Sequence, residues 1–323
     1  MSDKRTARPP ARPAGPPGSG EAAGPDPAQG PDAAQATDVT PEPDAATRAT
    51  EGARGTVLLT GAAGRLGTAL RAGLPALGWG LRCLDRVAVP GDPGAVVAEL
   101  DDEAALREAA RGADAVVHLA GHPGERDFPE LVRNNILGSY HLYEAVRREG
   151  VPRVVAASSN HAVGFARCPD TGQPPIPVDG PHRPDTFYGL TKCVGEDLAE
   201  LYWARTGIET VSLRIGGCYE RPRNARELSI WLSHGDLVRL VHAALTAPRV
   251  GHTVVNGVSD NTRGVLDLSA ARRLGYRPLD DAEDHAAAVL ADGAPGWARP
   301  GTPPLGGDFM SMWGEWPPLP DRG

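Results

Sequence analysis

From Thr56 onward, short apolar runs alternate along the chain with segments long enough for helices. Runs of Val, Leu, Ile and Ala bounded by turn residues are typical of buried strands. Because continuous apolar strands between helices indicate a parallel sheet covered on both faces, the pattern predicts a doubly wound α/β fold. The predicted strands are residues 57–60, 81–85, 96–100, 115–119, 153–158 and 209–214, and the predicted helices are 65–77, 103–111, 129–149, 185–206 and 236–247. Asp127 is the predicted N-cap of the third helix.

Residues 1–54 differ in composition from the rest of the chain. Pro, Ala, Gly, Asp and Arg dominate there, ten prolines fall before Ala45, and apolar periodicity is missing. Such a segment buries too little apolar surface to offset the entropy lost on ordering, so we predict a disordered extension. A functional tail is the alternative.

Residues 55–323 are predicted to form one domain with a small C-terminal substrate lobe. About 110 residues follow the last predicted strand, and they include one clear helix and a tail from Gly293 rich in Pro, Gly and Trp. This length leaves room for a lobe and not for a second independent domain. The lobe is expected to come mainly from residues 160–184, which include a Pro- and Gly-rich loop, and from 216–323.

The charge balance and the hydropathy argue against two classes of partner. The chain has 33 Lys and Arg against 41 Asp and Glu, a net charge of −8, and its basic residues form no cluster. Nucleic acid or an anionic membrane requires Lys and Arg gathered on one face. No apolar run approaches the ~18–20 residues of a membrane helix, and the N-terminal sequence lacks the apolar core of a secretory signal, so we expect a cytoplasmic protein.

The four cysteines lie far apart in the sequence. Cys83, Cys168, Cys193 and Cys218 form neither a CxxC pair nor a Cys/His spacing suited to zinc. We therefore expect reduced thiols, with no disulfide scaffold and no bound metal.

A glycine-rich turn follows the first predicted strand. Residues 61–67 read Gly-Ala-Ala-Gly-Arg-Leu-Gly and lead directly into a helix. Glycines at such a turn let the backbone approach a pyrophosphate, and the N-terminus of the helix offers N–H groups to the anion. The turn predicts a Rossmann-type dinucleotide site, with a purely structural turn as the alternative.

Asp85 ends the second predicted strand, 24 positions beyond Gly61 (85 − 61). An acid about 20 residues beyond such a turn bonds the hydroxyls of the adenosine ribose, and its charge repels a 2′-phosphate. Asp85 therefore favours NAD over NADP. The neighbouring Arg86 weakens this preference, because a guanidinium is suited to binding a phosphate.

A tyrosine and a lysine stand four positions apart in the fourth predicted helix. This spacing places Tyr188 and Lys192 on one helix face. The ammonium is expected to stabilise a phenolate and to lower the pKa of the tyrosine from about 10, which suits a general base. Ser159, Asn160 and His161 follow the end of a strand, where open α/β sheets bind ligands, and their side chains are suited to the reacting oxygen and the neighbouring hydroxyls. A structural hydrogen bond is the alternative role for His161.

The glycine turn, the ribose acid, the strand-end serine and the YxxxK pattern, in this order, resemble the extended branch of the short-chain dehydrogenase/reductase (NAD-dependent epimerase/dehydratase) superfamily. The likeness spans residues 56–278 and implies that Ser159, Tyr188 and Lys192 form the catalytic triad, with Asn135 supporting the active site. The NAD-binding residues that the resemblance implies are Gly61, Gly64, Arg65, Leu66, Gly67, Asp85, Glu99, Leu100, Leu119, Ala120, Gly121, Tyr188, Lys192 and Ile215.

Four blocks resemble the uronate dehydrogenases within that superfamily. The blocks are residues 157–165, 188–196, 213–216 and 226–234. The resemblance implies oxidation of a hexuronic acid at C1 with NAD, which gives an aldarolactone. It also implies that Arg226 holds the substrate carboxylate, a task suited to a planar guanidinium. Pairing of Arg226 with Glu220 or Glu227 at the surface is the alternative. The implied substrate-binding residues are Ser159, Asn160, His161, Gly217 and Arg226.

Several positions depart from the pattern of the uronate dehydrogenases. Pro123 and Gly217 stand where that family has substrate-contacting serines, and each loses a hydroxyl worth roughly 0.5–1.5 kcal/mol in a hydrogen bond. Glu99 replaces the usual aspartate near the adenine, and residues 264–267 replace paired tryptophans. We expect the chemistry to be kept, with a different or broader choice of acid.

Two other functions fit the same fold. A nucleotide-sugar dehydratase would carry an Asp-Glu pair where this chain has Asn160 and His161, and an epimerase usually needs a larger C-terminal lobe. A non-catalytic NAD(P) sensor commonly lacks the tyrosine or the lysine of the triad, and this chain has both. Because relatives on this fold often pair through exposed helices, we expect a homo-oligomer.

Overall fold

The computed structural model describes residues 54–170, 172–291 and 304–307. The predicted disordered extension at 1–54 therefore lies outside the described residues, apart from Arg54. The same holds for the Pro-, Gly- and Trp-rich tail from Gly293, apart from residues 304–307.

Seven parallel strands form the central sheet. They are β1 (Gly55–Thr60), β2 (Trp79–Asp85), β3 (Val96–Val97), β4 (Ala115–His118), β5 (Arg153–Ser159), β6 (Glu209–Ile215) and β9 (His252–Gly257). Their order is β3-β2-β1-β4-β5-β6-β9, so the direction of winding reverses between β1 and β4. The carboxyl ends of the strands at such a reversal form the crevice in which open sheets bind ligands. The doubly wound parallel fold predicted from the apolar runs is confirmed.

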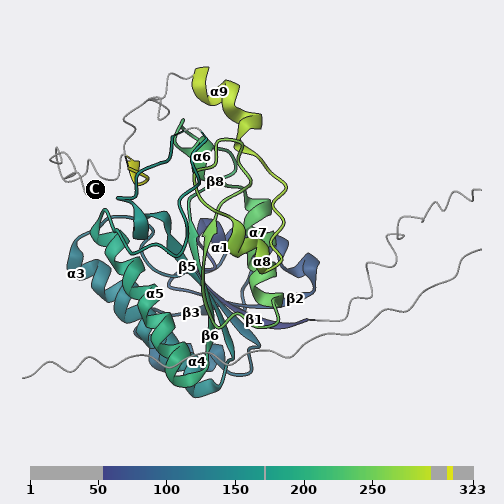
Figure 1. Cartoon of the computed structure of the whole chain (residues 1–323). Helices are drawn as coiled ribbons and strands as arrows, with labels where there is room; N and C mark the ends of the chain where they lie inside the picture. The colour runs from purple at the N-terminus through teal and green to yellow at the C-terminus, as the bar shows by residue number, and fades with distance from the viewer. Residues whose placement is uncertain (1–53, 171, 292–303, 308–323) are drawn as a thin grey trace, which may run out of the picture. The chain divides into compact units, whose positions relative to one another are not determined.

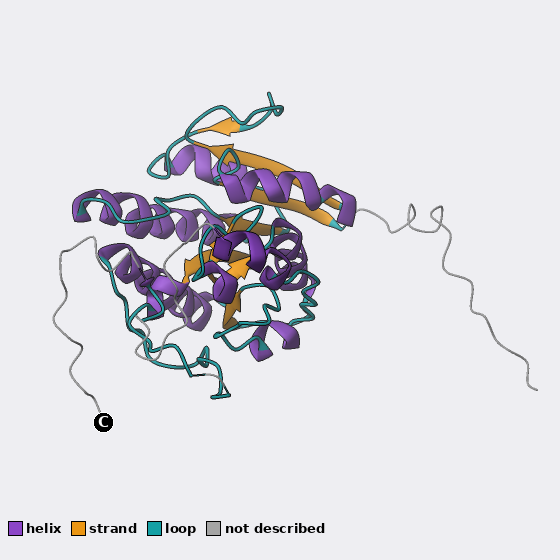
Figure 2. Ribbon diagram, turned by 90° about the horizontal axis from the view of Figure 1, so that it is seen from above, coloured by secondary structure: helices purple, strands orange, loops and turns teal. Residues whose placement is uncertain are grey.

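Helices cover both faces of the sheet (Figures 1 and 2). The helices of the described residues are α1 (Arg65–Gly73), α2 (Glu103–Ala110), α3 (Phe128–Leu131), α4 (Gly138–Glu149), α5 (Phe187–Thr206), α6 (Glu227–Ile230), α7 (His234–Thr246), α8 (Ser269–Arg273) and α9 (Ala286–Ala291). Leu106 of α2, Leu142 of α4 and Ala199 of α5 share one buried cluster. Leu70 of α1 and Leu240 of α7 belong to the cluster on the opposite face. The strands are apolar along their length because both of their faces meet helices.

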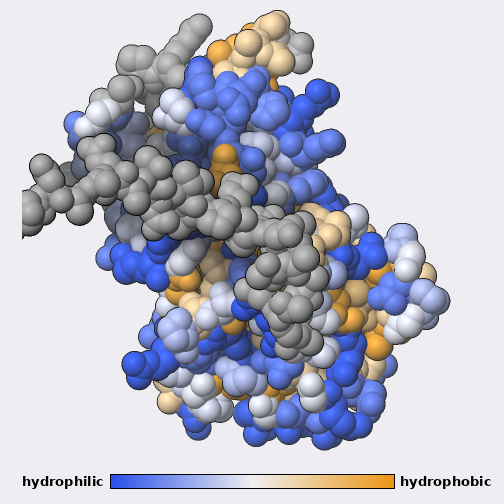
Figure 3. Space-filling model, turned by 90° about the vertical axis from the view of Figure 1, so that its right-hand side faces the viewer, coloured by the Kyte–Doolittle hydropathy of each residue, from blue (hydrophilic) through white to orange (hydrophobic). Residues whose placement is uncertain are grey.

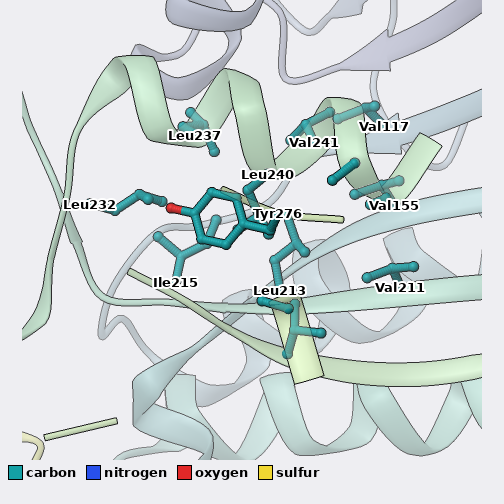
Figure 4. Packing of buried hydrophobic residues seen from close by; sticks show 14 of the residues in the cluster. Val117, Val155, Val211, Leu213, Ile215, Leu232, Leu237, Leu240, Val241 and Tyr276 are labelled. Carbon is teal, nitrogen blue, oxygen red and sulfur yellow. The ribbon is translucent and has the colours of Figure 1, made fainter. Parts of the chain in front are cut away.

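The larger cluster is built around a buried tyrosine. Tyr276 lies among Leu240, Ile215 and Leu213 in Figure 4. Its side chain is fully buried, and its hydroxyl donates a hydrogen bond to the carbonyl of Val258 at 3.0 Å. A satisfied hydroxyl allows the whole ring to be buried. Because Leu213 and Ile215 belong to β6, this packing fixes a strand whose end borders the candidate site.

Two of the predicted helices are interrupted. The segment 65–77 divides into α1 and a 3-10 turn at Pro75–Leu77, since Pro75 has no N–H with which to continue the helix. The segment 129–149 becomes α3, a π-helical turn at Val132–Leu137 and α4. Apolar periodicity alone does not distinguish these breaks from one continuous helix.

The structure confirms one predicted N-cap and moves the start of another helix. Asp127 stands at the N-cap of α3, but within the described residues its main-chain carbonyl, not its side chain, accepts the hydrogen bonds of the first turn. The helix predicted at 185–206 begins at Phe187. Thr186 is its N-cap, with the hydroxyl accepting a hydrogen bond from the N–H of Gly189 at 2.9 Å. Asp185 is therefore outside the helix, and its carboxylate is available for another contact.

Strand β9 has no counterpart among the predicted strands. This strand pairs in parallel with β6 from Thr210↔His252 to Ile215↔Gly257. It falls inside residues 216–323, the range expected to build mainly the substrate lobe, and it extends the sheet instead. Its sequence, His-Thr-Val-Val-Asn-Gly, holds two large apolar residues, which give too weak a period to signal a strand. Two short strands, β7 (Gly217–Cys218) and β8 (Trp231–Leu232), pair separately from the main sheet.

Within the described part of the chain, no helix is long and apolar enough to cross a membrane. The side of the molecule seen in Figure 3 is largely hydrophilic, with hydrophobic residues in scattered patches. The four cysteines are unpaired thiols, and Cys83, Cys193 and Cys218 are buried.

Candidate active site

A cavity of about 520 Å³ opens at the carboxyl ends of β1, β2, β4, β5 and β6. Every residue that the sequence analysis assigned to cofactor or substrate lines it. Ser159, Tyr188 and Lys192 line it as well, whereas Asn135 lies behind its wall and is 5% exposed. One cavity thus unites the glycine turn, the helix with the Tyr-Lys pair and the loop that carries Arg226.

The glycine turn packs so tightly that side chains are excluded at two positions. Gly61 has a φ of +73°, and a Cβ there would lie 2.8 Å from the main-chain nitrogen of Ala120. A Cβ on Gly67 would lie 2.3 Å from the carbonyl oxygen of Gly61. Helix α1 begins at Arg65, its first residues line the cavity, and within the described residues no side chain caps its N–H groups. This backbone cradle fits a pyrophosphate.

Asp85 holds the glycine turn from the end of β2. Its carboxylate accepts hydrogen bonds from the N–H of Ala63 at 2.9 Å and of Val87 at 3.3 Å. It also lines the cavity, together with Arg86 and Glu99. A carboxylate beside a dinucleotide turn is placed to accept hydrogen bonds from ribose hydroxyls and to repel a phosphate.

Tyr188 and Lys192 lie on one face of α5, as their spacing predicts. The ammonium nitrogen of Lys192 is 5.4 Å from the centre of the Tyr188 ring, and it donates a hydrogen bond to the carbonyl of Ala157 on β5 at 2.9 Å. Both side chains line the cavity. The carbonyl fixes the ammonium beside the ring because it restrains the long lysine side chain at its far end.

Burial shifts the pKa values of both residues. It raises the pKa of Tyr188 to about 12, while a hydrogen bond with Ser159 acts in the opposite direction and Asp185 raises the pKa further. The expectation that the pKa of Tyr188 is lowered is therefore wrong for the protein by itself, because the loss of water outweighs the stabilisation of the phenolate. Burial also lowers the pKa of Lys192 to about 8, and the charge of Glu196 opposes this change.

The polar residues after β5 form one side of the cavity. Ser159 ends the strand and caps the 3-10 turn Asn160–Val163, its hydroxyl accepting a hydrogen bond from the N–H of His161 at 3.2 Å. With its side-chain oxygen toward Arg226, the Asn160 amide accepts a hydrogen bond from that guanidinium at 2.9 Å and donates one to the carbonyl of Ile215 at 3.2 Å. Asn160 thus connects the end of β5 to Arg226.

His161 has the structural hydrogen bond that the sequence analysis held open as an alternative, and it lines the cavity as well. Its Nδ1 lies 2.8 Å and 3.0 Å from the two carboxylate oxygens of Asp185. The imidazole packs edge-on against Tyr188, with ring centres 5.9 Å apart. A carboxylate on one ring nitrogen fixes the orientation of a histidine. Asp185 was placed in the helix by the sequence analysis, so this role was missed.

Asn135 braces the cavity from behind. Its side-chain oxygen accepts a hydrogen bond from the N–H of His122 at 2.7 Å, and its amide donates one to the hydroxyl of Thr191 at 3.0 Å. Thr191 precedes Lys192, and His122 follows the end of β4 by four residues. Asn135 therefore ties the cofactor side of the cavity to the helix with the Tyr-Lys pair.

Glu125 is a second brace, and no sequence motif pointed to it. Its carboxylate accepts hydrogen bonds from the N–H of Tyr188 at 2.7 Å and of Phe187 at 3.3 Å. These N–H groups belong to the first turn of α5, where a negative charge is favourable. A residue 63 positions away from Tyr188 thus caps the helix from the loop after β4.

The wall opposite the end of β5 is built from residues 217–227. A Cβ on Gly217 would lie 3.0 Å from Cγ of Glu227, so the carboxylate side chain occupies the space beside this glycine. Glu227 is buried and accepts hydrogen bonds from the guanidinium of Arg223, one of them at 2.5 Å. Glu227 thus forms its ion pair with Arg223, whereas the alternative reading of the sequence paired it with Arg226.

Two arginines stack on Tyr219 at the edge of this wall. The guanidinium carbons of Arg65 and Arg223 lie 4.0 Å and 3.3 Å from the ring centre. Arg65 also donates a hydrogen bond to the carbonyl of Cys218 at 2.9 Å. Because Arg65 begins α1, this contact joins the glycine turn directly to the wall. Cation–π contacts of this kind are worth about 0.5–2 kcal/mol each.

A dinucleotide turn, a Tyr-Lys pair and a crevice at the reversal of a parallel sheet define an NAD-binding enzyme fold. The model of the NAD dependent epimerase/dehydratase family matches residues 57–229, and the chain belongs to that family.

Among curated proteins, the chain is similar to uronate dehydrogenases over most of its length. It is 44% identical over 259 residues to the uronate dehydrogenase of Pseudomonas putida, which covers 78% of this chain and 94% of the relative. The uronate dehydrogenase of Agrobacterium fabrum is 43% identical over 230 residues, with coverages of 70% and 85%. The solved structure of a mutant uronate dehydrogenase from Agrobacterium tumefaciens complexed with NAD is 39% identical, with a TM-score of 0.72 and coverages of 79% and 97%.

Proposed function

We propose that the protein oxidises a hexuronic acid at C1 with NAD and releases an aldarolactone. The observation that carries this function is the meeting of the Tyr188-Lys192 pair with Arg226 in one cavity that also holds a dinucleotide turn. The 43–45% identity to three uronate dehydrogenases supports the same chemistry. The class is an NAD-dependent dehydrogenase acting on a CH–OH group.

The cavity fits NAD at three places. The main-chain cradle at Gly61 and Gly67 receives the pyrophosphate, and Asp85 receives the ribose hydroxyls. The ends of β4 and β6, at Leu119 and Ile215, line the rest of the cofactor side. NAD, when bound, supplies the acceptor for the hydride that leaves C1.

Tyr188 is the proposed general base. Its phenolate takes the proton of the C1 hydroxyl, so that a carbonyl forms at C1 as the hydride leaves. Ser159 donates a hydrogen bond to the same oxygen and thereby holds it in line with the phenol. Burial and the charge of Asp185 favour the protonated phenol, while the hydrogen bond with Ser159 favours the phenolate. We propose that the Lys192 ammonium, 5.4 Å from the ring centre, adds to the stabilisation of the phenolate.

Arg226 is the proposed anchor of the substrate carboxylate. A guanidinium grips both oxygens of a carboxylate, which fixes the far end of the sugar as well as its charge. The hydrogen bond to Asn160 turns the guanidinium toward the end of β5, where Ser159 and His161 stand. Orientation of this kind brings C1 to the phenol, and misplacement by about 1 Å can cost 10²-fold in rate.

At Gly217 the pocket of this protein differs from the pattern of the uronate dehydrogenases. A serine hydroxyl is expected there, and here Glu227 fills the space beside the glycine. Pro123 lines the cavity at the second such position. We propose that the pocket recognises the acid mainly through its carboxylate and discriminates less between hydroxyl epimers. The cytoplasmic location and the homo-oligomer stay predictions.

The test is a screen of NAD reduction by the full chain with galacturonate, glucuronate, mannuronate and neutral aldoses. We expect NADH to form with at least one hexuronate and at least tenfold less with neutral aldoses. Turnover of a UDP-sugar without net NADH would instead indicate an epimerase. A response to NAD without any turnover would indicate a sensor, and either result would overturn the proposal.

A further inference from the structure

A short turn near the C-terminus, residues 304–307, packs against the substrate side of the cavity. This C-terminal turn closes with a hydrogen bond from the N–H of Gly307 to the carbonyl of Pro304 at 3.0 Å. The N–H groups of Leu305 and Gly306 donate to the carbonyls of Ala166 and Gly164, both at 2.9 Å. The turn is the isolated yellow piece beside the C label in Figure 1.

The anchoring is strong for so short a segment. The side chain of Leu305 is fully buried and belongs to the larger hydrophobic cluster. Complete burial of a leucine contributes about 1.5–3 kcal/mol. Its two main-chain partners, Ala166 and Gly164, lie just beyond the 3-10 turn that carries Asn160 and His161. The C-terminal turn is therefore fixed to the same wall as the polar residues of the site.

The carbonyl of Leu305 points back at Arg226. It accepts a hydrogen bond from Nε of Arg226 at 2.9 Å, while Nη2 of the same guanidinium donates to Asn160 at 2.9 Å. Two fixed acceptors on different nitrogens leave the planar group one orientation. Arg226 lines the cavity, and Leu305 lies behind it. A long arginine side chain is otherwise among those with the most rotamers to lose.

Gly307 provides the second contact of the turn with Arg226. Its φ is +60°, and a Cβ built there would lie 2.5 Å from Cδ and 2.7 Å from Nε of Arg226. Any side chain at this position would push the arginine. The glycine is thus required both by its left-handed backbone and by the close approach of the arginine.

We propose that the C-terminal turn is a positioning element that sets the reach and the angle of Arg226 and so tunes recognition of the substrate carboxylate. The inference deepens the proposed function and rests on it for the role of Arg226. The hydrogen bonds of the turn reach Gly164, Ala166 and Arg226, so we expect its effect to fall on binding of the acid.

The test compares two Gly→Ala variants of the full chain. Gly307→Ala places a methyl group against Arg226. Gly112→Ala is the matched control, since Gly112 has a similar φ of +68° with nothing within 4 Å of a Cβ. We expect Gly307→Ala to raise the KM for the hexuronate about tenfold relative to the control, with the KM for NAD within about twofold. Equal KM values for the acid in both variants would overturn the inference.

A second variant guards against a local failure to fold. Leu305→Ala loosens the docking of the turn while keeping its carbonyl, and we expect the same selective rise in the KM for the acid. Thermal unfolding of each variant shows whether the domain is intact. If an intact Leu305→Ala kept the KM of the unchanged chain, the positioning role would be wrong.

Arg226→Gln separates this inference from the proposed function. If Arg226 anchors the carboxylate, its loss raises the KM for the acid at least tenfold and reduces the preference for the acid over neutral aldoses. If Arg226→Gln leaves that preference unchanged, the proposed role of Arg226 fails, and the inference with it. If only the Arg226 variant has an effect, the proposed function stands and the C-terminal turn has no positioning role.

Discussion

The Lys192 ammonium lies 5.4 Å from the centre of the Tyr188 ring and is held there by the carbonyl of Ala157 at 2.9 Å. This carbonyl belongs to β5, so the strand and α5 share the task of placing a cation beside the phenol. Burial, with the charge of Asp185 adding to it and a hydrogen bond with Ser159 opposing it, raises the pKa of Tyr188 to about 12. A buried tyrosine therefore needs a nearby positive charge to form its phenolate more than an exposed tyrosine does.

Replacing the phenol should abolish turnover and leave the fold intact. Tyr188→Phe removes the group that accepts the C1 proton while keeping the ring that packs against His161. We expect kcat to fall at least 10³-fold, in line with the loss of a general base. Binding of NAD, followed by titration of intrinsic fluorescence, should stay within about threefold. Turnover within tenfold of the unchanged protein would assign the base to another residue.

The carboxylate of Asp85 should set the preference for NAD. Asp85→Asn keeps an oxygen for the N–H of Ala63 and removes the charge that repels a 2′-phosphate. Arg86 then lies next to an uncharged side chain. We expect the ratio of kcat/KM for NAD to that for NADP to fall at least tenfold, measured with one acid substrate. An unchanged ratio would mean that the charge of Asp85 does not select the cofactor.

A methyl group on Gly67 should destroy the phosphate turn. Its Cβ would lie 2.3 Å from the carbonyl oxygen of Gly61, and backbone atoms on both sides prevent any adjustment. We expect Gly67→Ala to lose measurable NAD binding and to lower the midpoint of thermal unfolding. Gly195→Ala, in α5, is the control: a Cβ there meets nothing within 4 Å, and the change should add up to about 1 kcal/mol of stability. Similar NAD affinities in the two variants would contradict the cradle.

Glu196 should make the stability of the protein depend on pH in the acid range. It lies buried under the cavity and accepts hydrogen bonds from Arg214 at 2.9 Å and 2.7 Å and from Ser158 and His182. These partners lower its pKa to about 2 against the opposing effect of burial. A carboxyl whose pKa is lower in the folded state stabilises the fold above its unfolded pKa of about 4.5, and that contribution is lost as the pH falls toward 2.

The measurement is urea unfolding at about pH 6 and pH 3. Glu196 should account for about 2 kcal/mol of the loss in unfolding free energy between these values, so Glu196→Gln should have a correspondingly smaller pH dependence. The variant should also be about 3–5 kcal/mol less stable at neutral pH, because Arg214 is left buried without its carboxylate. Parallel pH dependences of the two proteins would show that the folded pKa of Glu196 is not depressed.

Local signals in the sequence were enough for the fold and for much of the site. The strands were predicted because parallel strands buried on both faces leave continuous apolar runs. The glycine turn, Asp85 and the Tyr188-Lys192 spacing could be located because each depends on a few neighbouring residues. β9 could not be predicted because its place at the edge of the sheet comes from pairing with β6, and its own sequence has a weak apolar period.

The residues that hold the site's side chains in place could not be predicted in this way, because they come from distant parts of the chain. Glu125 caps the helix of Tyr188 across 63 positions, and Leu305 holds Arg226 across 79. Asp185 holds His161 only because α5 begins after it. Nothing in the local sequence at these positions indicates a partner.

The class of fold, the cofactor turn and the two side chains proposed for proton transfer could be predicted from the order of residues. Those features follow from periodicity and short-range spacing, which a single segment already contains. The direction of the pKa shift of Tyr188, the wall at Gly217 and the contact of the C-terminal turn with Arg226 became known from the folded structure. Each of these three features depends on burial or on contacts between distant segments, and both arise only when the chain folds.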